Sequence, residues 1–112
     1  MALFNKQVTF DRNKVQIKQV TKELIYIDYE IRQGKIVKRF TAQLTYMSYR
    51  GWDMYPGIFY CETRKDNGQQ LRSCVITNDD IAIQLRVKTL CSEFNRYVIN
   101  YVARLNKQPS WN

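Results

Sequence analysis

Histidine is absent from the 112-residue sequence, and glycine, proline and cysteine are scarce. Without histidine, the chain lacks the commonest general base and the commonest zinc ligand. Four glycines and two prolines are too few for a linker or a low-complexity tail. The three cysteines (Cys61, Cys74 and Cys91) show no C-x-x-C spacing. We therefore expect reduced thiols, no metal site and no disulfide framework.

Long apolar runs are also missing. No stretch approaches the length that spans a bilayer, and the opening residues, MALFNKQV, lack the basic start and apolar core of a signal peptide. These absences predict a cytoplasmic protein without membrane contact, in the host cytoplasm if the protein is viral. The length suits one domain, 1–112, with a single core.

No arrangement of residues indicates catalysis. The neighbouring carboxylates Asp28 and Glu30 fit a solvated strand face, and Asp79 and Asp80 fit the start of a helix. Cys91 has no histidine to activate it, and glycine-rich phosphate loops are absent. We expect a protein that is not an enzyme and binds no cofactor.

Charge is the clearest positive signal. Eighteen Lys and Arg against ten Asp and Glu give a net charge of +8, and the isoelectric point is near 9.6. Such a field attracts polyanions, of which nucleic acid is the usual one in a cell. An acidic protein surface is one alternative partner. The other alternative is a basic protein whose charge serves no particular partner.

The first predicted hairpin covers residues 24–46 and turns at Gln33-Gly34. Alternating apolar residues give it one core face and one wet face. A two-residue turn there predicts these core-face pairs: Ile31 with Ile36, Ile27 with Phe40, and Ile25 with Ala42. On the wet face it places Asp28 across from Arg39.

The second predicted hairpin covers residues 57–77 and turns at Asn67-Gly68, a favoured pair for a tight turn. This register predicts the pairs Phe59 with Ile76, Cys61 with Cys74, and Thr63 with Arg72. Both faces are partly apolar, which favours the inside of a sheet or a subunit contact. Cys61 and Cys74 would face each other, as packed thiols or as a cross-strand disulfide.

The two ends of the chain differ in the spacing of their apolar residues. Residues 8–20 predict a weaker strand or hairpin, with Lys14 and Lys18 discouraging edge pairing. After a cap at Thr77 or Asn78, apolar residues at steps of three and four predict one helix over about 79–106, roughly 42 Å long at 1.5 Å per residue. The alternative makes residues 81–87 a strand. The fold class is α+β: an antiparallel sheet of four to six strands with a long C-terminal helix across one face.

Residues 48–60, SYRGWDMYPGIFY, concentrate aromatic side chains beside an arginine. Gly51, Pro56 and Gly57 suggest that Tyr49, Trp52 and Tyr55 lie in a loop between strands. Exposed aromatic faces beside a cation are typical of proteins that stack single-stranded bases, at about 1–3 kcal/mol per base. The alternative is a loop whose aromatics fold back over the end of the sheet.

The function predicted is non-enzymatic binding of nucleic acid, with single-stranded DNA or RNA preferred. The predicted binding residues are Tyr49, Arg50, Trp52, Tyr55, Lys38, Arg39, Arg64 and Arg72. Further cations (Arg86, Lys88, Arg96, Arg104 and Lys107) lie along the predicted helix. The alternative is a small basic inhibitor or adaptor, of the phage or viral accessory type, that binds an acidic host protein or captures an anionic nucleotide.

A homodimer is also expected, because the long helix would extend beyond a domain of this size. The residues predicted to form its interface are Phe94, Tyr97 and Tyr101.

Overall fold

The computed structural model describes residues 9–107, except for the side chains of Pro56 and Asp79. It confirms the α+β fold: a five-stranded antiparallel sheet with a long C-terminal helix packed against it. A 3₁₀ turn at Arg12–Lys14 precedes the sheet. The strands and helices are β1 Gln16–Thr21, β2 Leu24–Gln33, β3 Ile36–Met47, β4 Gly51–Arg64, β5 Gln70–Ile76, α1 Asp79–Gln84 and α2 Lys88–Lys107.

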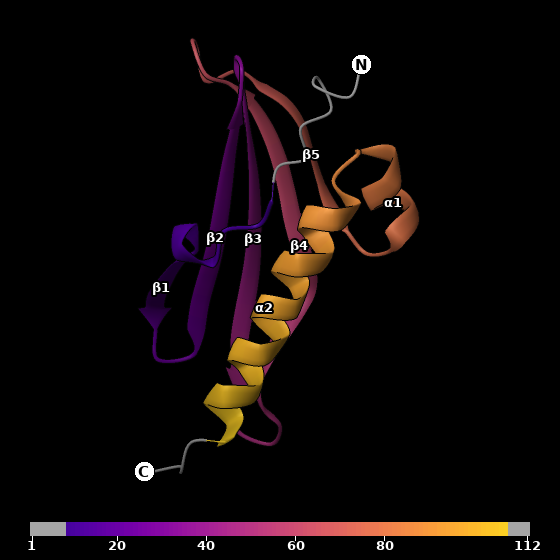
Figure 1. Cartoon of the computed structure of the whole chain (residues 1–112). Coiled ribbons are helices and arrows are strands. Elements are labelled where there is room, and N and C mark those ends of the chain that lie inside the picture. Colours follow the sequence, from indigo (N-terminus) through magenta and orange to yellow (C-terminus); the bar gives the residue numbers. More distant parts are fainter. Residues whose placement is uncertain (1–8, 108–112) are drawn as a thin grey trace.

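The strands lie side by side in sequence order, so β1 and β5 form the two edges. Helix α2 runs obliquely across one face of the sheet, with α1 beside its first turn (Figure 1). From Ile25 to Ile31, every second residue of β2 faces the helix and is buried, which gives the alternation expected of a strand with one covered face. From α2, Phe94 and Val98 are fully buried against this face. We call this the helix face and the opposite side the outer face.

The first hairpin has the predicted faces but a different register. The turn lies at Gly34 and Lys35, with Gln33 opposite Ile36, so each predicted pair is shifted by two residues. Gly34 has a φ of +59°, which suits glycine at the start of such a turn. Arg39 consequently lies opposite Glu30, and the predicted pairing of Arg39 with Asp28 is wrong.

The register of the second hairpin differs from the prediction by one residue. This shift moves the side chains of one strand to the opposite face of the sheet relative to those of the other strand. Tyr60 lies opposite Cys74, and Cys61 lies opposite Ser73. Cys61 is therefore on the outer face and Cys74 on the helix face, where it packs against the core. The predicted facing of Cys61 and Cys74 is wrong, and both are free thiols. The cause is a turn longer than two residues, followed by an irregularity in the β4–β5 pairing.

The single helix predicted over 79–106 is broken. Of the two predicted caps, Asn78 is the one that caps α1, accepting the Ile81 N–H at 3.1 Å through its side chain. The chain then leaves the helix at Leu85, and Arg86 adopts a φ of +58°. This break turns the chain so that Val87, which is 2% exposed, enters the core before α2 begins. The alternative strand over 81–87 is also wrong.

At the N-terminal end, the predicted edge strand is present as β1, while Val8 lies outside the described residues. The Asp11 side chain accepts the Asn13 N–H at 3.0 Å and caps the 3₁₀ turn.

The predicted loop around Trp52 is mostly strand. A short turn at residues 48–50 joins β3 to β4, and residues 51–57 form the first half of β4. The extra residues are absorbed by a bulge, because Ala42 pairs with Ile58 while Leu44 pairs with Met54.

Candidate nucleic-acid interface

The aromatic residues predicted to stack bases do not form one platform. Tyr49 and Tyr55 are 80% and 67% exposed. Trp52 is half-buried, packs against the core and meets Tyr46 edge-on, with ring centroids 5.5 Å apart. Trp52 therefore has both a structural contact and some accessible surface.

The four arginines of the predicted site all have carboxylate partners. The pairs are Arg39 with Glu30 at 2.9 Å, Arg50 with Asp53 at 3.0 Å, Arg64 with Asp66 at 2.9 Å, and Arg72 with Glu62 at 3.8 Å. The hydrogen bond from Arg39 lowers the pKa of Glu30, and that from Arg64 lowers the pKa of Asp66. Any phosphate at these arginines must compete with a carboxylate that is already in place.

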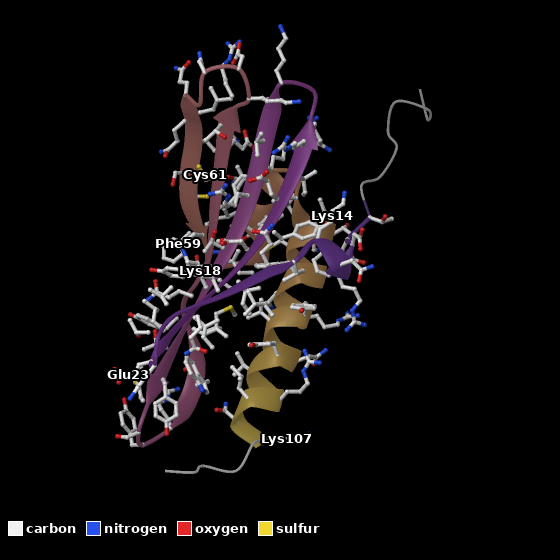
Figure 2. All side chains as sticks on the ribbon, turned by 90° about the vertical axis from the view of Figure 1, so that its left-hand side faces the viewer. Lys14, Lys18, Glu23, Phe59, Cys61 and Lys107 are labelled. Atoms are coloured by element: carbon white, nitrogen blue, oxygen red, sulfur yellow. The ribbon has the colours of Figure 1, made fainter. Side chains whose placement is uncertain are left out.

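Apart from Arg50, which neighbours Tyr49 in the turn, the predicted cations are also separated from the predicted aromatics. Arg39 is paired with Cys61 on the outer face, while Lys38 and Arg72 lie on the helix face. Figure 2 shows Cys61 and Phe59 on the side of the sheet away from α2. Along β3, the Arg39 position is seven residues from Tyr46, the partner of Trp52. At 3.3 Å per residue this is about 23 Å, so Trp52, Arg39 and Arg72 do not share one surface.

A different surface brings cations and aromatics together. A groove of about 550 Å³ lies between the segment before β1 and the outward side of α2. The groove is lined by Phe10, Arg12, Glu93, Arg96, Tyr97, Asn100, Ala103, Arg104 and Lys107. The helical members recur at steps of three and four residues, which places them along one side of α2. We call this surface the α2 groove.

Contacts between tilted aromatic rings fix the aromatic wall of the α2 groove. The ring of Phe10 lies 4.7 Å from that of Tyr29 and 6.1 Å from that of Tyr97. The next residue, Asp11, donates its N–H to the hydroxyl of Tyr29 at 3.0 Å. Because Tyr29 is buried in the sheet, these contacts attach the N-terminal segment to the core and hold Phe10 beside α2.

The α2 groove carries uncompensated positive charge. Its cations are Arg12, Arg96, Arg104 and Lys107, and Glu93 is its one acid. Among the side chains that the structure describes, these four cations form no ion pair. Arg104 lies over the ring of Tyr101, with its guanidinium carbon 5.7 Å from the ring centroid. All four cations are exposed.

Two of the three residues predicted to form a dimer interface border the α2 groove. Tyr97 lines it and is half-buried, and Tyr101 lies beneath Arg104. Phe94 is 0% exposed in the single chain, so it has no surface to offer a partner.

Only the helical side of this groove could be predicted from the sequence. The helical spacing of Arg96, Asn100, Arg104 and Lys107 places them on one side of a helix. Phe10 and Arg12 had no such signal, because only the fold brings the N-terminal segment to α2.

Comparisons with known proteins offer no guide to the site, since no family, no curated protein and no solved structure matches this chain. Over residues 9–107, no helix has the length and apolar character needed to cross a membrane. The same residues contain no cluster of three or more Cys, Asp or Glu side chains suited to a metal ion.

Proposed function

We propose that this chain is a non-enzymatic nucleic-acid-binding protein that holds single strands in the α2 groove. The observation that carries the proposal is the combination, in one groove along α2, of a fixed aromatic wall with four cations that form no ion pair among the described side chains. The groove replaces the binding surface predicted around Trp52, Arg39 and Arg72, whose parts lie far apart.

The pairing state of the cations favours the α2 groove. A free surface cation that meets a phosphate releases condensed counterions, and this release drives much of the binding. Arg39 or Arg64 would first have to give up a hydrogen-bonded carboxylate. Arg12, Arg96, Arg104 and Lys107 carry no such cost within the described residues.

The shape of the α2 groove favours single strands over duplex. From Arg96 to Lys107 the helix advances about 16 Å at 1.5 Å per residue, enough for a short run of nucleotides. The rings of Phe10 and Tyr97 lie beside this line of charge. Bases stack on such rings only when they are unpaired, while the cations follow the backbone.

Matched charge removals test this assignment. Arg96→Gln with Arg104→Gln removes two cations that have no ion pair within residues 9–107, and Arg39→Gln with Arg64→Gln removes two that are paired with carboxylates. Binding of fluorescent oligo-dT and oligo-U should weaken about tenfold or more in the first variant, because two cations that bind phosphate are removed. The salt dependence should also become shallower, by about 0.7 for each phosphate that the variant no longer neutralises.

The control variant, with the same change in net charge, should bind nearly as well as the wild type. Equal weakening in both variants would mean that net charge alone drives binding and would refute the assignment to the α2 groove. Failure to bind any oligonucleotide, together with stoichiometric capture of an acidic protein, would favour the inhibitor or adaptor function instead.

A further inference from the structure

Strand β5 is an edge of the sheet, and no other part of the described chain forms backbone hydrogen bonds with its open side. It runs from Gln70 to Ile76 and pairs only with β4 (Figure 1). Its first four residues are exposed, with Leu71 at 44%. Its backbone makes no hydrogen bond outside the sheet with any described residue.

The direction of the free backbone groups follows from the neighbouring turn. Arg64 donates its N–H to Gln69 and accepts the N–H of Gly68, so its backbone groups point toward β5. Backbone direction alternates along a strand, and Tyr60 therefore also points toward β5 and its partner Cys74. The N–H and C=O groups of Ser73 and Val75 consequently point away from the sheet.

The other open stretches of edge in this sheet are protected. Strand β1 has an irregularity after Gln19 and carries Lys18, two features that hinder pairing. The first half of β4 extends beyond β5, and there the side chain of Asn106 binds both backbone groups of Trp52. Strand β5 has an irregularity only at its start, between Gln70 and Arg72, and pairs regularly with β4 from Arg72 to Ile76. It has neither lysine nor proline, and such edges are templates for another strand.

Charge also permits two β5 strands to approach each other. The only charged residue of β5 is Arg72, whose charge is offset by Glu62 at 3.8 Å. Elsewhere the chain is strongly basic, with a net charge of +8. Charge repulsion between two copies along this edge would therefore be small.

We propose that β5 pairs antiparallel with β5 of a second copy of this chain, giving a continuous ten-stranded sheet. Ser73 is the middle residue of β5, so a symmetric pairing places it opposite the same residue of the second copy. The two-fold axis would stand perpendicular to the sheet and leave both α2 helices on one face. This interface differs from the one predicted on α2, and it does not depend on nucleic-acid binding.

The test is the molecular mass of nuclease-treated protein in solution, measured by light scattering over a range of micromolar concentrations. The wild type should approach twice the single-chain mass of 13.4 kDa. Ser73→Lys and Ser73→Glu should each raise the dimer dissociation constant about tenfold or more, because like charges would face each other. A mixture of the two variants should recover the dimer.

Gln16→Lys, on the exposed β1 edge, is the matched control and should leave the mass unchanged. Hydrogen exchange gives a second readout: the Ser73 and Val75 amides should be protected in the dimer and should exchange faster on dilution. A monomeric wild type would overturn the proposal, as would a dimer that is unaffected by both Ser73 variants.

Discussion

Asn106, in the last turn of α2, binds the backbone of Trp52 as a neighbouring strand would. Its Oδ1 accepts the Trp52 N–H at 2.8 Å, and its Nδ2 donates to the Trp52 carbonyl at 2.9 Å. The pairing with β5 ends at Ile58 opposite Ile76, so no strand of the described chain flanks this part of β4 on that side. The Asn106 side chain therefore fastens the end of α2, and with it the end of the α2 groove, to the sheet.

Replacing Asn106 with alanine should lower the free energy of unfolding by about 1–2 kcal/mol. The change removes two hydrogen bonds, each worth about 0.5–1.5 kcal/mol net. Asn100→Ala is the control, because Asn100 is exposed on the same helix and gains the same helix propensity. Urea unfolding measures both variants, and equal stabilities would contradict the role given to Asn106.

Gly51 should be less replaceable than Gly34, although both have positive φ. A Cβ on Gly51 would lie 2.6 Å from Oδ1 of Asn106, whereas a Cβ on Gly34 would meet no described atom within 4 Å beyond its chain neighbours. Gly34→Ala should cost about 1–2 kcal/mol of backbone strain. Gly51→Ala should cost about 1–2 kcal/mol more, through the displaced hydrogen bonds.

A double-mutant cycle isolates the contact of Gly51 with Asn106. In an Asn106→Ala background, the cost of Gly51→Ala should fall to that of Gly34→Ala. Fully additive costs would show that this contact does not limit the position.

Trp52→Ala should act mainly by lowering the stability of the fold, and not by removing a contact with the ligand. Trp52 is half-buried against the core, so we expect a loss of about 2–3 kcal/mol, below the cost at fully buried aromatic positions. Tyr49→Ala, at a side chain that is 80% exposed, should change stability by less than about 0.5 kcal/mol. Melting temperatures measure both, and an unchanged Trp52→Ala melt would refute the structural role of this side chain.

Arg86→Gly should give a more stable protein than Arg86→Ala. Arg86 has a φ of +58° at the break between the helices, a conformation that costs non-glycine residues about 1–2 kcal/mol. Glycine removes that strain but loses more chain entropy on folding, so the expected net advantage over alanine is about 0.5–1 kcal/mol. Thermal unfolding distinguishes the two, and a less stable glycine variant would contradict the strained conformation.

The strand faces could be predicted from the sequence more securely than the registers. In the first hairpin, a shift of two residues leaves the same side chains on the same face, so the pattern could not distinguish Gln33-Gly34 from Gly34-Lys35 as the turn. In the second, both faces are partly apolar. The alternation of apolar residues was therefore compatible with either register, including the observed one, which places Cys61 and Cys74 on opposite faces.

The broken helix and the α2 groove depended on tertiary contacts. Apolar residues continue at helical spacing through Leu85 and Val87, and only the packing of Val87 in the core requires a break. The cations on α2 were visible in the sequence, but their lack of partners among the described residues was not. In the sequence, Arg39 and Arg64 cannot be distinguished from the arginines of α2. The structure shows that Arg39 and Arg64 are already bound by carboxylates.

The most direct test of the central claim is a residue-resolved titration of the ¹⁵N-labelled protein with oligo-dT, followed by heteronuclear NMR. Binding in the α2 groove predicts the largest shift changes at Phe10, Arg12, Arg96, Asn100 and Arg104, with small changes at Arg39 and Arg64. Changes centred on Tyr49, Trp52 and Tyr55 would return the site to the β3–β4 turn. The absence of any change at saturating oligonucleotide in low salt would contradict nucleic-acid binding itself.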